Sequence, residues 1–350
     1  MAKTKPITDT KGRFDLAEFK KHKFSSQSVK FKSQEWIKLS PAFQEATNLP
    51  GVPKGHITLL RGHSDTGKTT ALLECAAQCQ RDGVLPVFII TEMKWNWEHA
   101  MEMGLQVNGV TNEDGEIIDY DGFFIFTDRS SLNTVEDIAE LINGLLKDQY
   151  EGKLPYDLCF LWDSVGSIPC AMSVEKLKNN NEWNAGAMST QFGNGVNQKI
   201  MLSRKEHMPY TNTLVAVNKV WVDKAAPGPM SQPKMMNKGG TTMHFDCSVM
   251  ITFGNIKNSG VSKLKATKDK KQIEWGKRTK VQVEKNHVTS LATKGQLIMT
   301  PYGFIGNEDK DIKQYKSEHS TEWATLLGGK DFKMEEEEVT DSNIETSDNE

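Results

Sequence analysis

The sequence lacks the features that mark several common classes of protein. Its 350 residues contain no apolar run close to the roughly 18 residues that a membrane helix needs, and no apolar segment follows Met1–Lys5 as it would in a secretory signal. No Cys-x-x-Cys pair and no zinc-ligand spacing is present. The odd number of cysteines argues against a disulfide framework: Cys75, Cys79, Cys159, Cys170 and Cys247. We therefore expect a reduced, cytoplasmic protein without a membrane partner.

Charge is spread unevenly along the chain. Lys and Arg number 43 and Asp and Glu 46, so the formal net charge is −3. Eight of the acids lie between Met334 and Glu350, where there is no base, which leaves the first 333 residues at about +5. A basic body with an acidic tail is common in proteins that handle nucleic acid. A solvated tail that only aids solubility would look the same, so charge alone leaves both interpretations open.

The most informative stretch, residues 62–69, reads Gly-His-Ser-Asp-Thr-Gly-Lys-Thr. It fits the phosphate-binding loop pattern of Gly, four residues, then Gly-Lys-Thr. A short strand is expected before it at 56–61 and a helix after it from Thr70, so backbone N–H groups and the helix dipole should converge on one anion. Lys68 should then contact the β- and γ-phosphates of ATP, and the Thr69 hydroxyl should bind Mg²⁺. The expected nucleotide-binding residues are Gly62, His63, Ser64, Asp65, Thr66, Gly67, Lys68, Thr69 and Thr70.

Strands alternate with helices along the following part of the chain, which predicts an α/β fold. Apolar runs at 87–91 and 123–127 are typical of strands buried on both faces of a parallel sheet, and an amphipathic helix is expected at 135–145. A third apolar run, 158–162, leads into Asp163 and Ser164, which fits a Walker B motif. An Asp at the carboxyl end of such a strand lies beside the phosphate loop and can bind Mg²⁺ through water. The length of chain between the two motifs indicates that another strand is inserted between theirs.

Two segments have the character of loops. Residues 174–187 are polar, and a long helix is expected after them to about His207. A strand at 213–218 ends at Lys219, and residues 220–240 then show no secondary-structure period. A long loop inside a compact domain is usually functional, and basic and aromatic residues suit single-stranded nucleic acid. The candidate DNA-binding residues are Trp221, Lys224, Lys234, Lys238, Gly239 and Gly240.

These landmarks, in this order, resemble the RecA family of ATP-dependent recombinases, and within it the phage UvsX-like branch. The resemblance covers about residues 50–305. It rests on the phosphate loop, the apolar strand ending at Glu92, the strand 158–164, the polar loop near 176–187, the strand 213–218 with its long loop closing at Gly239-Gly240, and Val283-Glu284-Lys285-Asn286-His287.

The resemblance implies a fold and a role for particular residues. The fold would be a RecA-like P-loop ATPase core, with a mostly parallel central sheet flanked by helices. Glu92 would polarise the water that attacks ATP, and Lys285 would reach across a subunit interface to the ATP of a neighbouring copy. Lys219 stands where relatives carry Gln or His to sense the γ-phosphate. His287 stands at the second basic position of the interface, so both residues depart from the pattern of the family.

The resemblance also implies a domain organisation and partners. Residues 1–35 would be a basic N-terminal arm for oligomerisation, 36–310 the ATPase core with DNA-binding loops near 174–187 and 220–240, 311–333 a C-terminal extension and 334–350 a disordered acidic tail. Partners would be single-stranded DNA, duplex DNA and further copies in a helical filament, together with single-strand-binding and loader proteins. A phage-encoded chain would act in the host cytoplasm.

The implied activity is DNA-dependent ATP hydrolysis by a recombinase that polymerises on single-stranded DNA and promotes homologous pairing and strand exchange. Two alternatives stay open. A hexameric helicase-type motor would use the same phosphate loop, but its relatives carry a separate N-terminal domain that 35 leading residues would not supply. A regulatory paralogue would bind ATP and a recombinase without exchanging strands, and the intact Lys68, Glu92 and Asp163 argue against it.

Overall fold

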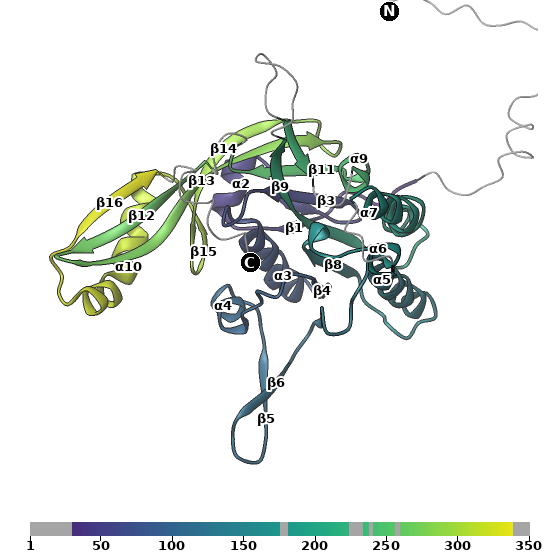
Figure 1. Ribbon diagram of the computed structural model, residues 1–350, viewed down its shortest axis with the longest axis horizontal. Coiled ribbons are helices and arrows are strands. Elements are labelled where there is room, and N and C mark those ends of the chain that lie inside the picture. The colour runs from purple at the N-terminus through teal and green to yellow at the C-terminus, as the bar shows by residue number, and fades with distance from the viewer. Residues whose placement is uncertain (1–29, 176–180, 224–233, 238–240, 256–259, 339–350) are drawn as a thin grey trace, which may run out of the picture.

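The computed structural model describes residues 30–175, 181–223, 234–237, 241–255 and 260–338. These residues form an α/β fold with a large, mostly parallel central sheet flanked by helices (Figure 1), as the sequence predicts. None of the described helices is long and apolar enough to cross a membrane. The expected basic arm at 1–35 lies outside the described residues up to residue 29.

The parallel part of the sheet brings the sequence motifs together. Its strands lie in the order β11, β3, β9, β8, β4, β7, and each neighbouring pair is parallel. Their bounds are β3 (Ile57–Gly62), β4 (Leu85–Ile90), β7 (Ile125–Asp128), β8 (Leu158–Asp163), β9 (Thr213–Asp223) and β11 (Val249–Phe253). Strands β3 and β8 are not neighbours, as expected, but the strand between them is β9, which follows the Walker B motif in the sequence; β4 and β7, which precede that motif, lie beyond β8.

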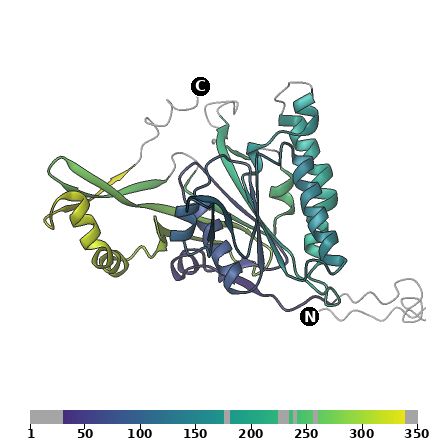
Figure 2. The same cartoon turned by 90° about the horizontal axis from the view of Figure 1, so that it is seen from below.

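Helices cover both faces of this sheet because its strands carry apolar side chains in both directions. On β8, Phe160 and Trp162 belong to one core cluster, and Cys159 and Leu161 belong to the other. Figure 2 shows the two helix layers on either side of the sheet. The cluster that contains Phe160 and Trp162 is covered by α5 (Val135–Tyr150), α7 (Asn181–Met188), the π-helical segment η2 (Ser189–Val196), α8 (Asn197–Leu202) and α9 (Thr242–Asp246). The cluster that contains Cys159 and Leu161 is covered by α2 (Pro41–Thr47), α3 (Lys68–Arg81) and α4 (Trp97–Glu102).

Antiparallel strands extend the sheet beyond β11. They are β13 (Lys271–Asn286), β14 (Thr293–Thr300) and β15 (Gly303–Ile305), in that order outward from β11. Helix α2 lies so close to β14 that a Cβ atom on Gly295 would stand 2.2 Å from the carbonyl oxygen of Ala46. A glycine at 295 therefore permits the close packing of α2 on the sheet.

The far end of β13 forms a separate small core. Strand β12 (Val261–Lys268) pairs with β13, and helix α10 (Asp309–Leu327) packs on the pair around Trp275, Tyr315 and Trp323. The ring centroids of Trp275 and Trp323 are 5.5 Å apart, and those of Trp275 and Tyr315 are 5.6 Å apart. In Figure 1 this part, coloured light green to yellow, lies at one end of the molecule.

The acidic C-terminal segment differs from the expected disordered tail. Residues 333–338 form strand β16 (Lys333–Glu338), which pairs antiparallel with β12. Arg278 donates to both carboxylate oxygens of Glu336, at 2.9 and 3.2 Å, and Lys265 is paired with Glu337. The acidic run is therefore ordered here because a basic hairpin lies beside it. Residues 339–350 lie outside the described residues.

Both segments expected to be loops contain regular structure. Within 174–187, helix α6 (Ala171–Glu175) ends at residue 175 and α7 begins at 181. Ala187 and Met188, at the end of α7, pack against the core. Within 220–240, β9 continues to Asp223 and pairs antiparallel with β10 (Lys234–Asn237). Its residues 220–222 are Val, Trp and Val, which favour a strand. The helix expected to reach about His207 ends at Leu202.

The remaining elements lie at the edges of the central sheet or outside it. Strands β5 (Asn108–Thr111) and β6 (Ile117–Asp121) pair as a hairpin that projects from the body of the molecule (Figure 1). The strand expected to be buried at 123–127 is instead β7, which is only half-buried because it lies at the edge of the parallel sheet. Short strands β1 (Trp36–Lys38) and β2 (Gly51–Pro53) pair with each other, and the 3₁₀ turn η1 (Val165–Ser167) follows β8.

Candidate nucleotide site

A cavity of about 290 Å³ lies at the carboxyl ends of β3, β4 and β8, beside the middle of β9. Residues that the sequence singled out in four separate segments meet there, because the carboxyl ends of parallel strands share one edge of a sheet. The lining residues are Ser64, Asp65, Lys68, Thr69, Ile90, Glu92, Lys94, Trp95, Asp163, Val217 and Lys219.

The phosphate loop joins β3 to α3 and depends on glycines at both ends. Gly62 has φ of 153° and Gly67 has φ of 105°, which side chains rarely adopt. A Cβ on Gly62 would also stand 2.2 Å from the carbonyl oxygen of Phe253 on β11. Gly67 is the N-cap of α3 and has no side chain, so it offers no acceptor to the N–H groups of the first helical turn. This end of the 14-residue helix suits an anion.

Lys68 is the cation of the loop and is only 6% exposed. Its ammonium group donates to the carbonyl oxygen of His63, which curls the loop over the side chain. Burial lowers the pKa of Lys68 to about 8, although Asp163 and Glu92 act in the opposite direction. An anionic phosphate beside this ammonium group would favour its charged form.

Thr69 and Asp163 form the part of the site that suits a hard metal ion. The Thr69 hydroxyl donates to Oδ2 of Asp163 over 2.7 Å. Burial raises the pKa of Asp163, and the hydrogen bond from Thr69 opposes that rise. A hydroxyl and a carboxylate oxygen, both at the phosphate loop, are the donor types that Mg²⁺ takes beside substrate phosphates. The pair predicted from sequence is therefore brought into direct contact, and the donor set fits the ion.

Glu92 stands across the cavity, two residues after the end of β4. Its Oε1 accepts hydrogen bonds from the hydroxyls of Ser164, at 2.7 Å, and Ser167, at 3.2 Å, and lies 3.1 Å from Nζ of Lys219. Burial alone would raise the pKa of Glu92, but the Ser164 hydroxyl and the Lys219 ammonium group outweigh it and lower the pKa. The carboxylate is thus ionised and held in place, which suits the binding and orientation of a water molecule.

Three residues of the site had no place in the sequence-based prediction. Ser167 bonds Glu92, while Lys94 and Trp95 line the cavity next to it. Trp95 packs edge-on against Phe88 of β4, with 5.0 Å between the ring centroids. Ser167 follows Ser164 by three residues on the turn after β8, but this spacing alone does not indicate a contact with Glu92.

The two interface candidates lie away from this cavity. Lys285, on β13, donates to the carbonyl oxygens of His244, at 3.1 Å, and Phe245, at 2.7 Å, near the end of α9. His287 follows β13, its side chain is exposed, and its backbone N–H donates to the carbonyl oxygen of Ser248 over 2.8 Å. Neither residue lines the cavity, so a role at the nucleotide site of a neighbouring copy stays a prediction.

The candidate DNA-binding residues are only partly described. Trp221 lies on β9 and Lys234 on β10, and the two strands place Trp221 opposite Met236. Lys224, Lys238, Gly239 and Gly240 lie outside the described residues. The hairpin nevertheless continues directly from the nucleotide site, because Lys219 and Trp221 belong to the same strand.

A glycine loop between a parallel strand and a helix, a buried lysine and a Thr–Asp pair together define a P-loop nucleotide-binding protein. Comparison with known proteins narrows this class. The model of the RecA N-terminal domain family matches residues 23–116. Similar curated proteins include "Protein RecA" of Oleidesulfovibrio alaskensis, which is 25% identical over 247 residues that cover 69% of this chain and 58% of that protein.

Shorter matches point to the same family. "Protein RecA" of Aquifex aeolicus is 31% identical over 119 residues, covering 33% of this chain and 34% of the relative. "Protein RecA" of Francisella philomiragia is 36% identical over 69 residues, covering 20% and 19%. The chain thus spans between about a fifth and three fifths of the length of these relatives. The matches support the RecA family at low identity.

Proposed function

We propose that this chain is an ATP-dependent recombinase of the UvsX-like branch, which forms filaments on single-stranded DNA and exchanges strands with homologous duplex DNA. The observation that carries the proposal is the cavity in which Lys68, Thr69, Glu92 and Asp163 meet, at the root of the β9–β10 hairpin. In this proposal residues 36–310 are the ATPase core, and 311–333 with the acidic segment form a C-terminal extension. The recombinase would act in the cytoplasm, on DNA and alongside single-strand-binding and loader proteins.

Each residue of the cavity would have one task in ATP hydrolysis. The N–H groups at the start of α3 and the Lys68 ammonium group would bind the phosphates, and Thr69 and Asp163 would hold Mg²⁺. When bound, Mg²⁺ supplies positive charge that neutralises the phosphate oxygens. Glu92 would orient the attacking water and accept its proton, with Ser164 and Ser167 fixing the carboxylate. Lys219, which pairs with Glu92, would sense the γ-phosphate.

The experiment that tests the proposal is negative-stain microscopy of the protein with an ATP analogue and single-stranded DNA. A helical filament is expected, because nucleotide bound between copies and DNA bound along the axis would both favour ordered polymerisation. A closed ring would instead indicate a helicase-type motor. Single particles that bind ATP without assembling would indicate a regulatory paralogue, and either result would contradict the proposal.

Removal of the acidic segment should strengthen binding to duplex DNA. Truncation after Lys333 deletes eight acids and frees Lys265 and Arg278, which pair with Glu337 and Glu336. If the two freed cations contact phosphates, the dependence of log affinity on log salt should steepen by about 1.8. Fluorescence anisotropy with labelled duplex at several salt concentrations measures both effects.

A matched variant separates charge from strand pairing in the same experiment. Glu336→Gln with Glu337→Gln keeps the backbone of β16 and removes the two ion pairs. It should reproduce most of the gain in duplex affinity if the carboxylates compete with DNA. Equal duplex affinity for the parent, the truncation and this variant at low salt would show that β16 does not restrain DNA binding.

A second prediction concerns His287. If His287 contacts the phosphates of a neighbouring copy, a cation at this position should stabilise the transferring phosphoryl group. His287→Ala should therefore slow DNA-dependent hydrolysis, and His287→Lys should hydrolyse ATP at least as fast as the parent. Parent rates for both variants in steady-state kinetics would show that His287 has only a structural role.

A further inference from the structure

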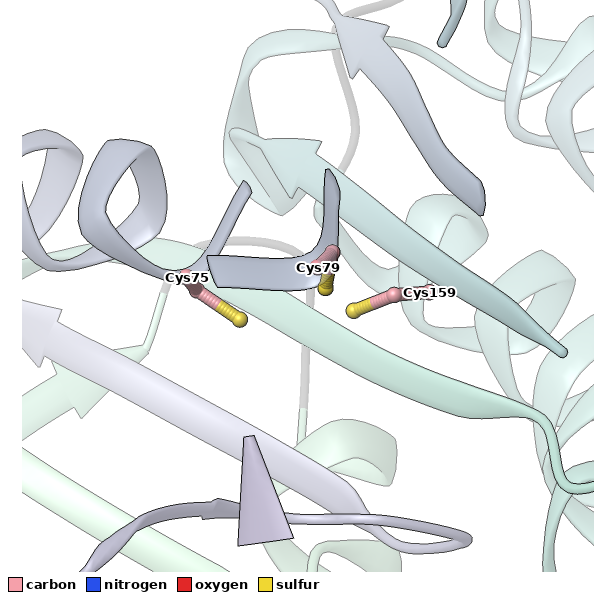
Figure 3. A group of neighbouring side chains, drawn as sticks. All are labelled: Cys75, Cys79 and Cys159. Carbon is pink, nitrogen blue, oxygen red and sulfur yellow. The ribbon is translucent and has the colours of Figure 1, made fainter. Parts of the chain in front are cut away.

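Three cysteines meet inside the core, behind the phosphate loop. The sulfur atoms of Cys75, Cys79 and Cys159 all lie within 4.8 Å of one another. Figure 3 shows the three side chains pointing toward a common point, two from helix α3 and one from strand β8. In the described part of the chain this is the one group of His, Cys, Asp and Glu side chains whose geometry suits a metal ion.

The local structure explains why these sulfurs converge. Cys75 and Cys79 are four residues apart on α3 and so lie on the same face of the helix. Cys159 alternates with Phe160 on β8 and points to the face of the sheet that α3 covers. By the rise of 1.5 Å per residue, Cys75 lies about 10 Å and Cys79 about 16 Å along α3 from Lys68, and none of the three cysteines lines the nucleotide cavity.

The surroundings restrict the chemistry of the trio. All three side chains are completely buried, and their neighbours in the core are apolar, including Leu72 and Leu161. The trio therefore offers sulfur ligands alone, and a metal ion must displace thiol protons in order to bind.

We propose that Cys75, Cys79 and Cys159 form a three-sulfur site for Cu(I). Thiolates select soft ions such as Cu(I), whereas structural zinc sites take four ligands, and none of the described residues supplies a fourth to this group. Three sulfurs at about 2.3 Å from one ion stand about 4 Å apart, which is within the spread of the trio. Binding forms three Cu–S bonds, releases three thiol protons to water and leaves the oxidation state of copper unchanged.

A bound ion would join α3 to β8, the two elements that carry Lys68 and Asp163. It should therefore raise the unfolding temperature of the full-length protein, since binding to the folded state alone stabilises that state. Because the trio has no exposed surface, uptake should be slow and should accelerate under conditions that open the core locally. Neither readout depends on ATP hydrolysis, so the site can be tested whatever the outcome for the proposed recombinase.

The test is an anaerobic titration of the reduced full-length protein with Cu(I), in competition with the chromophoric chelator bicinchoninate. One tightly held Cu(I) per chain is expected, and X-ray absorption should show only sulfur around it. Three variants should each lower the affinity for Cu(I) by more than about 100-fold: Cys75→Ala, Cys79→Ala and Cys159→Ala. Loss of a residue that merely hydrogen-bonds a metal ligand already costs up to about 100-fold, and these variants remove the ligand itself. Cys170→Ala, at a buried cysteine outside the trio, is the matched control and should leave the affinity unchanged.

Three results would overturn the assignment. One is the absence of Cu(I) binding in competition with the chelator. Another is binding that survives all three substitutions, and the last is a preference for Zn²⁺ in a four-coordinate site. Spectroscopy of the parent protein keeps the test decisive if a variant unfolds, because nitrogen or oxygen ligands around copper in the parent would exclude the three-sulfur site without any substitution.

Discussion

Glu92→Gln is expected to lower DNA-stimulated ATP hydrolysis by about 100- to 10,000-fold while nucleotide affinity changes little. The amide keeps the size of the side chain and can still accept from Ser164 and Ser167, but it cannot take a proton from water. Lys68→Ala should instead abolish nucleotide binding, because it removes the buried cation of the phosphate loop. Steady-state kinetics together with binding of a fluorescent nucleotide separate the two steps.

Glu98→Gln is the matched control for the first variant. Glu98 lies in the first turn of α4, outside the cavity, and its side chain is exposed. The substitution should leave both hydrolysis and nucleotide affinity at the level of the parent. If Glu92→Gln hydrolyses ATP at the parent rate on DNA, another group activates the water and the assignment of Glu92 is wrong.

Lys68→Met should stabilise the nucleotide-free protein at neutral pH. The pKa of Lys68 is lowered from 10.5 to about 8 by burial, so the folded state bears the cost of a buried charge below about pH 8. A shift of this size corresponds to at most about 3 kcal/mol in the free energy of unfolding. The increase in the free energy of unfolding should be smaller than this limit. Lys68 attracts the carboxylates of Asp163 and Glu92, and the variant loses that attraction.

The pH dependence gives this prediction its sign. Between about pH 8 and 10.5 the unfolded chain holds the Lys68 proton and the folded chain releases it, so the parent becomes more stable relative to the variant as pH rises. Urea unfolding at several pH values should show the advantage of Lys68→Met in full below pH 8 and declining above it. Lys94→Met, at an exposed lysine that lines the same cavity, should show neither effect. A constant difference between parent and Lys68→Met at all pH values would exclude a buried charge as the cause.

The local parts of the site could be predicted from the sequence because each is encoded within a few residues. The phosphate loop is a contiguous pattern, and Asp163 ends an apolar run whose length and composition mark a buried strand. In the structure the Thr69 hydroxyl lies 2.7 Å from Oδ2 of Asp163. The principle that carboxyl ends of parallel strands share one edge was sufficient to predict that contact.

The contacts that fix Glu92 could not be predicted, because they join three segments that are distant in the sequence. Ser167, on the turn after β8, and Lys219, on β9, reach Glu92 only once β4, β8 and β9 are ordered in the sheet.

The order of the acidic segment could not be predicted either. Its composition favours disorder, and only the pairing of β12 with β13 places Lys265 and Arg278 where they can order β16.

Strand β16 has a consequence for how copies of this chain can meet. The open edge of a β-sheet is a general template for uncontrolled aggregation with other edges. Strand β16 occupies the edge of β12, and it carries four successive carboxylates, Glu335 to Glu338. Like charges that face each other across paired strands are destabilising, so this edge disfavours pairing with the same edge of another copy. In the proposed filament, copies would then join through other surfaces.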